Sequence, residues 1–454
     1  MATESDPRPW EALEEIARAG DASRLEQFVA SLPPMEAVRA ITRLNVEDQA
    51  RVLAMLPAKR AADLLEETPE VEAREMLEHL SPEDAAAILA EMPSDEQADL
   101  LTGLSDADAE SILDEMPESE AAEARSLVRF KPDEAGGLMV TAHLAFHENS
   151  SVARVLDDLR TNAERYAGYD VQYVYVTSSF NDLVGVLPLR DLLLTRPDRQ
   201  ISDLMIRAPL AVDSHATLDE LNDVFGRHGF LGVPVIDRGG RLIGVVRRAD
   251  VEQALAERAG RSFLKTQGII GGDELRTMPT MVRTWRRFYW LSANILLNIL
   301  AASVIAFYEE TLAQVIALAV FLPIISDMSG NAGIQASAVS MRELELGLIR
   351  PRELLRVWTK EISLGLINGI ALGVLLGTVA FIWKGNAWLG AVVGAAMMLN
   401  TIVAVTVGGT IPLILKMLKK DPALASGPIL TTVTDMCGFF FALSFATLLL
   451  SKLT

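Results

Sequence analysis

The alternation of apolar and polar positions predicts short amphipathic helices over residues 1–132. Segments such as AAAILAEM, QADLLTGL and AESILDEM each have a narrow apolar stripe and an acidic opposite face. Prolines interrupt the pattern about every 12 residues, at Pro57, Pro69, Pro82, Pro93 and Pro117. Because helices this short cannot bury an apolar face alone, we expect them to stack into an α-superhelical domain.

Residues 133–260 change to short β-branched runs, which predict strands. The segment VYVTSSFNDLVGVLPLRDLL is followed by a similar one, VPVIDRGGRLIGVVRRADVE. Each copy predicts strand, turn, strand and then an aspartate near a helix start, with matching spacings from Gly185 to Asp191 and from Gly244 to Asp250. This repeat resembles a tandem pair of α+β CBS modules, which we place at 133–199 and 200–260.

Long apolar segments dominate the remainder of the chain. We expect a connecting helix over 261–286, followed by an all-α transmembrane domain over 287–454. Its five spans are predicted near 288–308, 313–339, 361–383, 387–415 and 427–451. Each is long enough to cross about 30 Å of hydrocarbon, and five in succession are too many for an apolar soluble core. The chain is therefore expected to be a multidomain membrane protein in contact with lipid.

Basic residues indicate how these spans are oriented. Arg283, Arg286 and Arg287 precede the first span, and five further basic residues lie between the second and third. The opposite loops carry Glu309, Glu310 and a lone Lys384. The positive-inside rule therefore places the amino-terminal domains in the cytoplasm and the carboxyl end outside the plasma membrane. The first 20 residues lack an apolar stretch, so we expect no cleavable signal peptide.

Charge is distributed unevenly along the chain. Residues 1–135 contain 33 Asp and Glu against 12 Lys and Arg, whereas the whole chain has a net charge of −20. An acidic head of this kind excludes nucleic acid as the expected partner. It leaves open a solvated helical surface or a set of oxygen ligands for hard divalent cations. The single cysteine, Cys437, excludes a disulfide or thiolate metal site within one chain.

Two aspartates, Asp327 and Asp435, fall within predicted spans. A carboxylate at this depth costs about 2.5–3.5 kcal/mol on insertion scales, so it persists mainly where it faces a partner, a cavity or an ion path. Gly427, Thr431 and Asp435 are spaced i, i+4, i+8 and share one helix face. We expect this face to line a cation route, although a structural hydrogen bond is an alternative role for either aspartate.

The second span contains the sequence Ser329 to Gly333, which includes Asn331. We expect the helix to break here, with freed carbonyls lining a cavity. A wide site with few acids suits Mg²⁺, which keeps most of its water ligands. Co²⁺ or Mn²⁺ remains the nearest alternative. A single pore carboxylate provides few ligands and little negative charge for a divalent ion. A two-fold homodimer would bring two copies of Asp435 to one axis.

The whole chain resembles the MgtE family of magnesium transporters and channels. The similarity is carried by P-x6-G-N-x-G-x-Q from Pro323 to Gln335, by DPALASGP and TTVTD ending at Asp435, and by EAGGLM at 134–139. The resemblance implies a homodimer with its pore at the dimer axis, selective Mg²⁺ passage and Asp435 as the ion-binding carboxylate. It also implies ATP binding by the CBS pair, at positions matching Tyr173, Arg190, Asp191 and Phe230.

The sequence departs from this family in the region that senses internal Mg²⁺. Family members have a dense acidic run at the end of the second CBS module and in the connecting helix, which Mg²⁺ bridges to close the pore. Here Asp250 and Asp219 remain as candidate metal ligands, amid four arginines: Arg247, Arg248, Arg258 and Arg261. Because fixed ion pairs can replace a bridging cation, we expect closure by internal Mg²⁺ to be weakened.

Two readings from other classes compete with a transporter. An intramembrane aspartyl protease would use Asp327 and Asp435, but the G-x-G-D context is missing around both. A nucleotide sensor merely anchored to the membrane would not need five spans with polar interruptions. We therefore expect a transporter of Mg²⁺ and not an enzyme.

Overall fold

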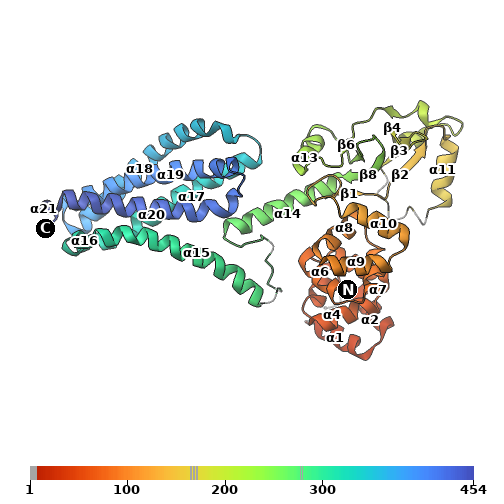
Figure 1. The fold of residues 1–454 in the computed structure, drawn as a ribbon, viewed down its shortest axis with the longest axis horizontal. Helices are drawn as coiled ribbons and strands as arrows, with labels where there is room; N and C mark the ends of the chain where they lie inside the picture. The colour runs from red at the N-terminus through yellow and green to blue at the C-terminus, as the bar shows by residue number, and fades with distance from the viewer. Residues whose placement is uncertain are drawn as a thin grey trace, which may run out of the picture. The chain divides into compact units, whose positions relative to one another are not determined.

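The computed structural model describes residues 8–163, 166, 169, 172–272, 274–276, 278 and 280–454 (Figure 1). The chain divides after Arg258 into two compact units, and each is considered by itself. The first unit contains the amino-terminal helices and the two sheets. The second, Ala259–Thr454, contains the long apolar helices.

Ten short helices make up the described part of the amino-terminal domain. They are α1 (Pro9–Ala19), α2 (Ala22–Ser31), α3 (Pro34–Ile41), α4 (Val46–Met55), α5 (Ala58–Glu66), α6 (Glu70–Glu78), α7 (Pro82–Leu89), α8 (Ser94–Gly103), α9 (Asp106–Glu115) and α10 (Glu118–Leu127). Asn45, Ser81 and Ser105 start their helices by accepting a hydrogen bond from the backbone N–H three residues further on. Helices two apart in the chain pack on one another, so the expected stacked superhelix is confirmed.

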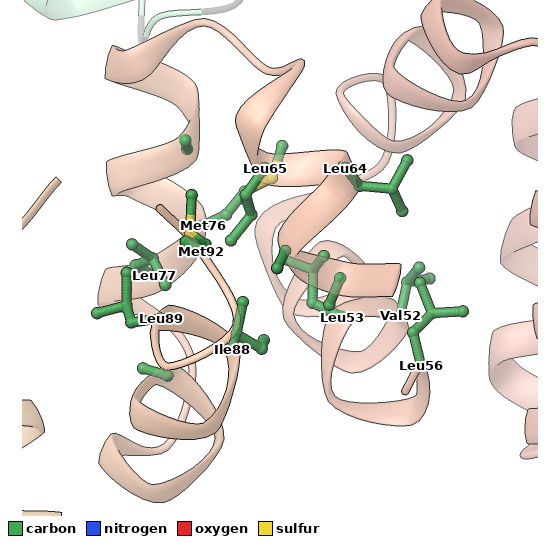
Figure 2. Close-up of a cluster of buried hydrophobic side chains, with 14 of the residues drawn as sticks. Val52, Leu53, Leu56, Leu64, Leu65, Met76, Leu77, Ile88, Leu89 and Met92 are labelled. Carbon is green, nitrogen blue, oxygen red and sulfur yellow. The ribbon is translucent and has the colours of Figure 1, made fainter. Parts of the chain in front are cut away.

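One continuous apolar core joins these helices. Figure 2 shows part of it, where side chains of α4 to α7 meet. Leu53, Leu65, Met76, Leu77 and Leu89 are almost fully buried here. Each contributes about 1.5–3 kcal/mol of transfer free energy, which explains how helices of about three turns stay folded.

The next region contains two four-stranded sheets, in the strand orders β2-β3-β4-β5 and β1-β8-β7-β6. The elements are β1 (Met139–Val140), β2 (Leu144–His147), α11 (Val152–Thr161), β3 (Tyr173–Thr177), β4 (Leu183–Pro188), α12 (Leu189–Leu194), η1 (Ile201–Asp203), β5 (Ile206–Arg207), β6 (Val212–Asp213), α13 (Leu218–Arg227), β7 (Gly232–Ile236) and β8 (Leu242–Arg247). The expected tandem α+β repeat is therefore present.

Two strands do not follow the expected module boundaries of 133–199 and 200–260. β1 belongs in sequence to the first module but pairs with β8 of the second sheet. β5 lies beyond residue 200 but pairs with β4 of the first sheet. The two copies also meet at an isolated antiparallel bridge between Asp182 and Arg241, which occupy matching positions in the repeat.

The structure differs from the expected connecting helix over 261–286. Helix α14 (Arg248–Thr266) begins directly after β8 and ends earlier, and α15 (Thr280–Phe307) begins only at Thr280. Gly268, Gly271 and Gly272 all have positive φ, a backbone conformation that glycine adopts without steric cost. These glycines stop α14 and turn the chain before the first apolar helix.

Five helices of the second unit are long and apolar enough to cross a membrane, as expected. The elements are α15, α16 (Glu309–Gln314), η2 (Ile316–Val320), α17 (Leu322–Glu345), η3 (Pro351–Glu353), α18 (Leu354–Lys384), α19 (Ala387–Met417), α20 (Pro422–Leu448) and α21 (Leu450–Leu453). Helix α19 is the most buried of the five and packs against α17, α18 and α20.

The expected helix break at Ser329–Gly333 is wrong, because α17 runs unbroken from Leu322 to Glu345. Gly333 in this segment allows close helix packing instead of unwinding the helix. A Cβ on Gly333 would lie 2.8 Å from the Ala404 carbonyl oxygen, and a Cβ on Gly408 would lie 2.2 Å from the Gly333 carbonyl oxygen. Only glycine lets α17 and α19 approach this closely.

Candidate functional site

An open cavity of about 760 Å³ lies between α15, α17 and α20 in the second unit. Its apolar lining includes Leu297, Ile305 and Phe439. Its polar lining is made by carboxylate, amide and hydroxyl groups of these three helices: Asn294, Asn298, Ser326, Asp327, Asn331, Thr431, Thr432 and Asp435. Such a concentration of oxygen ligands within apolar helices is typical of an ion or substrate path.

Asp435 is half-buried in α20, and its Oδ1 accepts a hydrogen bond from the Ser326 hydroxyl of α17. Asp327 is more exposed than Asp435 and directly follows Ser326 in α17. Its Oδ2 accepts a hydrogen bond from Asn331 Nδ2 at 3.4 Å. The cavity therefore contains two carboxylates from two helices, and each has a neutral hydrogen-bond donor beside it.

The structure brings together four of the five residues expected in the membrane site. Asp327, Asn331, Thr431 and Asp435 all line the cavity. Gly427 does not belong to its lining, although its carbonyl oxygen accepts a hydrogen bond from the Thr431 hydroxyl at 3.2 Å. The helix face defined by the i, i+4, i+8 spacing therefore lines the cavity only from Thr431 onward.

Four polar lining residues were not identified from the sequence: Asn294, Asn298, Ser326 and Thr432. The asparagines offered a usable signal, because they are spaced i, i+4 within the mainly apolar part of α15 that follows its arginines. Ser326 and Thr432 offered none, since serine and threonine are common in packed membrane helices.

The two remaining candidate metal ligands, Asp250 and Asp219, belong to the first unit and do not share a site. Asp250 lines an acidic cavity of about 280 Å³ between the helical domain and α14. Asp219, at the start of α13, is not part of that cavity and pairs with Arg258. Among the described residues, no three Asp, Glu, His or Cys side chains converge closely enough to hold a metal ion.

Burial and crowding raise the pKa of two carboxyl groups in this second cavity. Besides Asp250, its acidic lining residues are Glu66, Glu67, Glu70, Asp95, Glu96, Asp99 and Glu257. Burial, reinforced by the Asp95 charge, raises the pKa of Glu96 to about 8. Burial and the Asp250 charge raise the pKa of Asp95 to about 6, against the opposing effect of Arg247. Arg247 lies between the acids, with Nε 2.7 Å from Asp250 Oδ2 and Nη2 3.4 Å from Asp95 Oδ2.

The four expected nucleotide-binding residues do not line one common cavity. Tyr173, the first residue of β3, lines a cavity of about 450 Å³ between the helical domain and the sheets. Arg190, Asp191 and Phe230 are not part of its lining. Because Pro188 ends β4, Arg190 and Asp191 lie in the exposed first turn of α12. The Nε atom of Arg190 lies 3.4 Å from Oδ1 of Asp191. Phe230 stacks on His228, with ring centroids 4.9 Å apart.

Comparison with known proteins covers all three regions of the chain. Residues 322–445 match the MgtE family model described as a divalent cation transporter. Residues 32–133 match the MgtE intracellular N domain, and residues 201–257 match the CBS domain.

Two relatives extend this similarity, and one solved structure is similar in part. The magnesium transporter MgtE of Thermus thermophilus is 32% identical over 443 residues, which cover 97% of this chain and 98% of the relative. The magnesium transporter MgtE of Bacillus subtilis is 32% identical over 327 residues, 72% of each chain. The crystal structure of the cytosolic domain of the Mg²⁺ channel MgtE in complex with ATP is 30% identical, with a TM-score of 0.49, and covers 54% of this chain and 99% of its own.

Proposed function

This chain belongs to the MgtE family of magnesium transporters, and from that premise we propose that Mg²⁺ crosses the membrane by a channel-like path past the Asp435 carboxylate. The chain is a transporter and not an enzyme. We therefore assign the two intramembrane aspartates to transport and not to peptide hydrolysis.

The polar cavity of the second unit is the observation that carries the proposal. Mg²⁺ prefers hard oxygen ligands and dehydrates reluctantly, so it is usually bound by one or two carboxylates while it keeps several waters. The cavity offers Asp327 and Asp435 as carboxylates, with the Thr431 hydroxyl and the Asn331 amide beside them. Its volume of about 760 Å³ leaves room for a hydrated ion.

We propose that two copies of the chain complete the path. A single chain provides no cluster of three charged metal ligands among its described residues, whereas a two-fold axis beside α20 would double every carboxylate at the site. The working unit is therefore a homodimer with the pore between its subunits, set in the plasma membrane. Its helical and CBS domains face the cytoplasm and its carboxyl end faces outside, following the positive-inside bias.

The cytosolic domains are proposed to gate this path, with weakened sensing of internal Mg²⁺. Support comes from two arginines held in ion pairs: Arg247 with Asp95 and Asp250, and Arg258 with Asp219. Each supplies a permanent positive charge beside an acid that would otherwise attract Mg²⁺. A weaker sensor responds only above the Mg²⁺ concentration at which the ion displaces these arginines.

We further propose that an adenine nucleotide binds the CBS pair at Tyr173. The ring of this residue lines a cavity that also contains Tyr175 and His143, and aromatic faces suit a purine base. Tyr173→Ala should then weaken nucleotide binding, measured by calorimetry on the full chain. Unchanged affinity would move the site toward the exposed Arg190 and Asp191.

Flux into vesicles tests the transport proposal. The purified chain should carry Mg²⁺ into proteoliposomes that contain a Mg²⁺-sensitive dye, and Asp435→Ala should abolish this flux. Cys437→Ala is the matched control, since Cys437 lies in the same helix but not in the cavity lining. Excess Co²⁺ or Mn²⁺ should compete poorly with Mg²⁺. Strong preference for either ion would favour that cation as the substrate, and full flux in Asp435→Ala would contradict the proposed path.

A further inference from the structure

The Ser326 hydroxyl contacts the carboxylate that the transport proposal places on the ion path. It lies in α17 and donates a hydrogen bond to Oδ1 of Asp435 in α20. No second donor to this carboxylate is found among the residues that the structure describes, so Oδ2 remains available to the cavity. A hydrogen bond to one oxygen restrains the rotation of a carboxylate, which limits the directions in which its other oxygen can point.

The backbone around Ser326 is itself held in place. Asn400 of α19 is fully buried, and its Nδ2 donates to the carbonyl oxygen of Ile325, directly before Ser326, at 3.4 Å. The same Nδ2 would lie 2.7 Å from a Cβ on Gly438, which is three residues beyond Asp435. Asn400 thus touches both α17 and α20 beside the Ser326–Asp435 hydrogen bond, and the small size of Gly438 allows it to do so.

We propose that Ser326 is a positioning residue for ion binding, which orients the Asp435 carboxylate so that Oδ2 faces the passing Mg²⁺ or its water shell. This inference rests on the proposed transport function and deepens it. Hydrogen bonds to charged groups contribute more than neutral ones. A freely rotating Asp435 would present the correct oxygen for only part of the time, and a hydrated ion would be bound more weakly.

The test compares Ser326→Ala with Ser326→Thr, which keeps the hydroxyl, in the full chain reconstituted into vesicles. Ser326→Ala should raise the Mg²⁺ concentration for half-maximal flux about tenfold, with a smaller change in maximal rate. Ser326→Thr should restore this concentration to within about threefold of the starting chain. Ser329→Ala is the matched control, because Ser329 is buried in the same helix and is absent from the cavity lining.

The outcomes separate a positioning role from a structural one. A structural defect would lower the maximal rate in Ser326→Ala and leave the half-saturating concentration unchanged, which would overturn the inference. Failure of threonine to rescue would overturn it too. If Asp435→Ala abolishes flux while Ser326→Ala matches the starting chain, the transport proposal stands and this inference alone fails. If the intact chain carries no Mg²⁺, both fail together.

Discussion

Arg247 at the end of β8 reaches Asp95 in α8, with its Nη2 3.4 Å from Asp95 Oδ2. Both side chains are largely buried, at 29% and 10% exposure, so this pair joins the helical domain to the CBS pair in a poorly solvated position. Without the arginine, the neighbouring carboxylates would repel one another. A bound divalent cation is the alternative means of neutralising their charge. If the cytosolic domains sense Mg²⁺ as proposed, this arginine should make the contact less dependent on the ion.

Removing this arginine should restore dependence on Mg²⁺. In Arg247→Gln, Asp95 and Asp250 lose their fixed cation, and the first unit should lose roughly 2 kcal/mol of unfolding free energy. Limited proteolysis across a Mg²⁺ titration should show little added protection in the starting chain and clear protection at low millimolar Mg²⁺ in the variant. Arg227→Gln, which removes an exposed pair with Asp223, is the control. Strong protection of the starting chain at the same concentration would contradict the weakened sensor.

The raised pKa of Glu96 predicts a pH dependence of stability. The folded state holds this proton up to about pH 8, whereas the unfolded state releases it near the ordinary glutamate value of 4.5. Between these values the folded state binds more protons, so unfolding free energy should fall as pH rises, by at most about 1.4 kcal/mol per pH unit. Thermal unfolding at pH 6 and pH 8 measures this slope. Glu96→Gln should flatten it, and an unchanged slope in the variant would assign the effect to other groups.

Close packing of α17 on α19 predicts that two glycine substitutions change the melting temperature by very different amounts. Gly408→Ala should disrupt this packing, because its Cβ would lie 2.2 Å from the Gly333 carbonyl oxygen. Gly427→Ala meets no atom within 4 Å among the described contacts, and alanine favours a helix by about 1 kcal/mol. The melting temperature of the purified chain in detergent should fall by several degrees in the first variant and not in the second. Equal melting temperatures would show that the helices can separate without cost.

Asp421 both caps the start of α20 and pairs with Lys265, and this predicts unequal effects of removing either member of the ion pair. Its Oδ1 accepts from the Ala423 backbone N–H at 2.9 Å, and its Oδ2 lies 2.9 Å from Lys265 Nζ. Lys265→Ala removes only a partly exposed ion pair, worth about 0–1 kcal/mol. Asp421→Ala also removes the helix cap, for about 1 kcal/mol more. Hydrogen exchange in the first turn of α20 should therefore rise more in Asp421→Ala. Equal exchange in the two variants would show that the cap contributes nothing.

Periodicity was sufficient to predict the short helices, the tandem repeat and the five spans, because each depends on local patterns of burial. It also placed Asp435 and Thr431 on one face of a helix, and both line the cavity, since neighbours at i−4 and i+4 share a face. Their role in ion passage stays a prediction. The MgtE resemblance added the identity of the ion.

Contacts between segments far apart in the chain were not predictable in the same way. Ser326 meets Asp435 only because α17 and α20 pack side by side, and no pattern in either segment specifies that register. The glycines at 330 and 333 were interpreted as a helix break, although the helix is continuous and Gly333 packs tightly against α19. Asp219 was grouped with Asp250 by charge, whereas the structure gives each its own arginine.

The exchange of β1 and β5 between the two sheets has a consequence for dissecting this protein. A cut at residue 200 would separate β5 from the first sheet, and a fragment starting there would also lack β1. Each half would then expose an unpaired strand edge, and such edges promote aggregation. Any shortened form meant to retain the fold of this region should therefore keep residues 133–260 together, since the two CBS copies exchange strands and are topologically one folding unit.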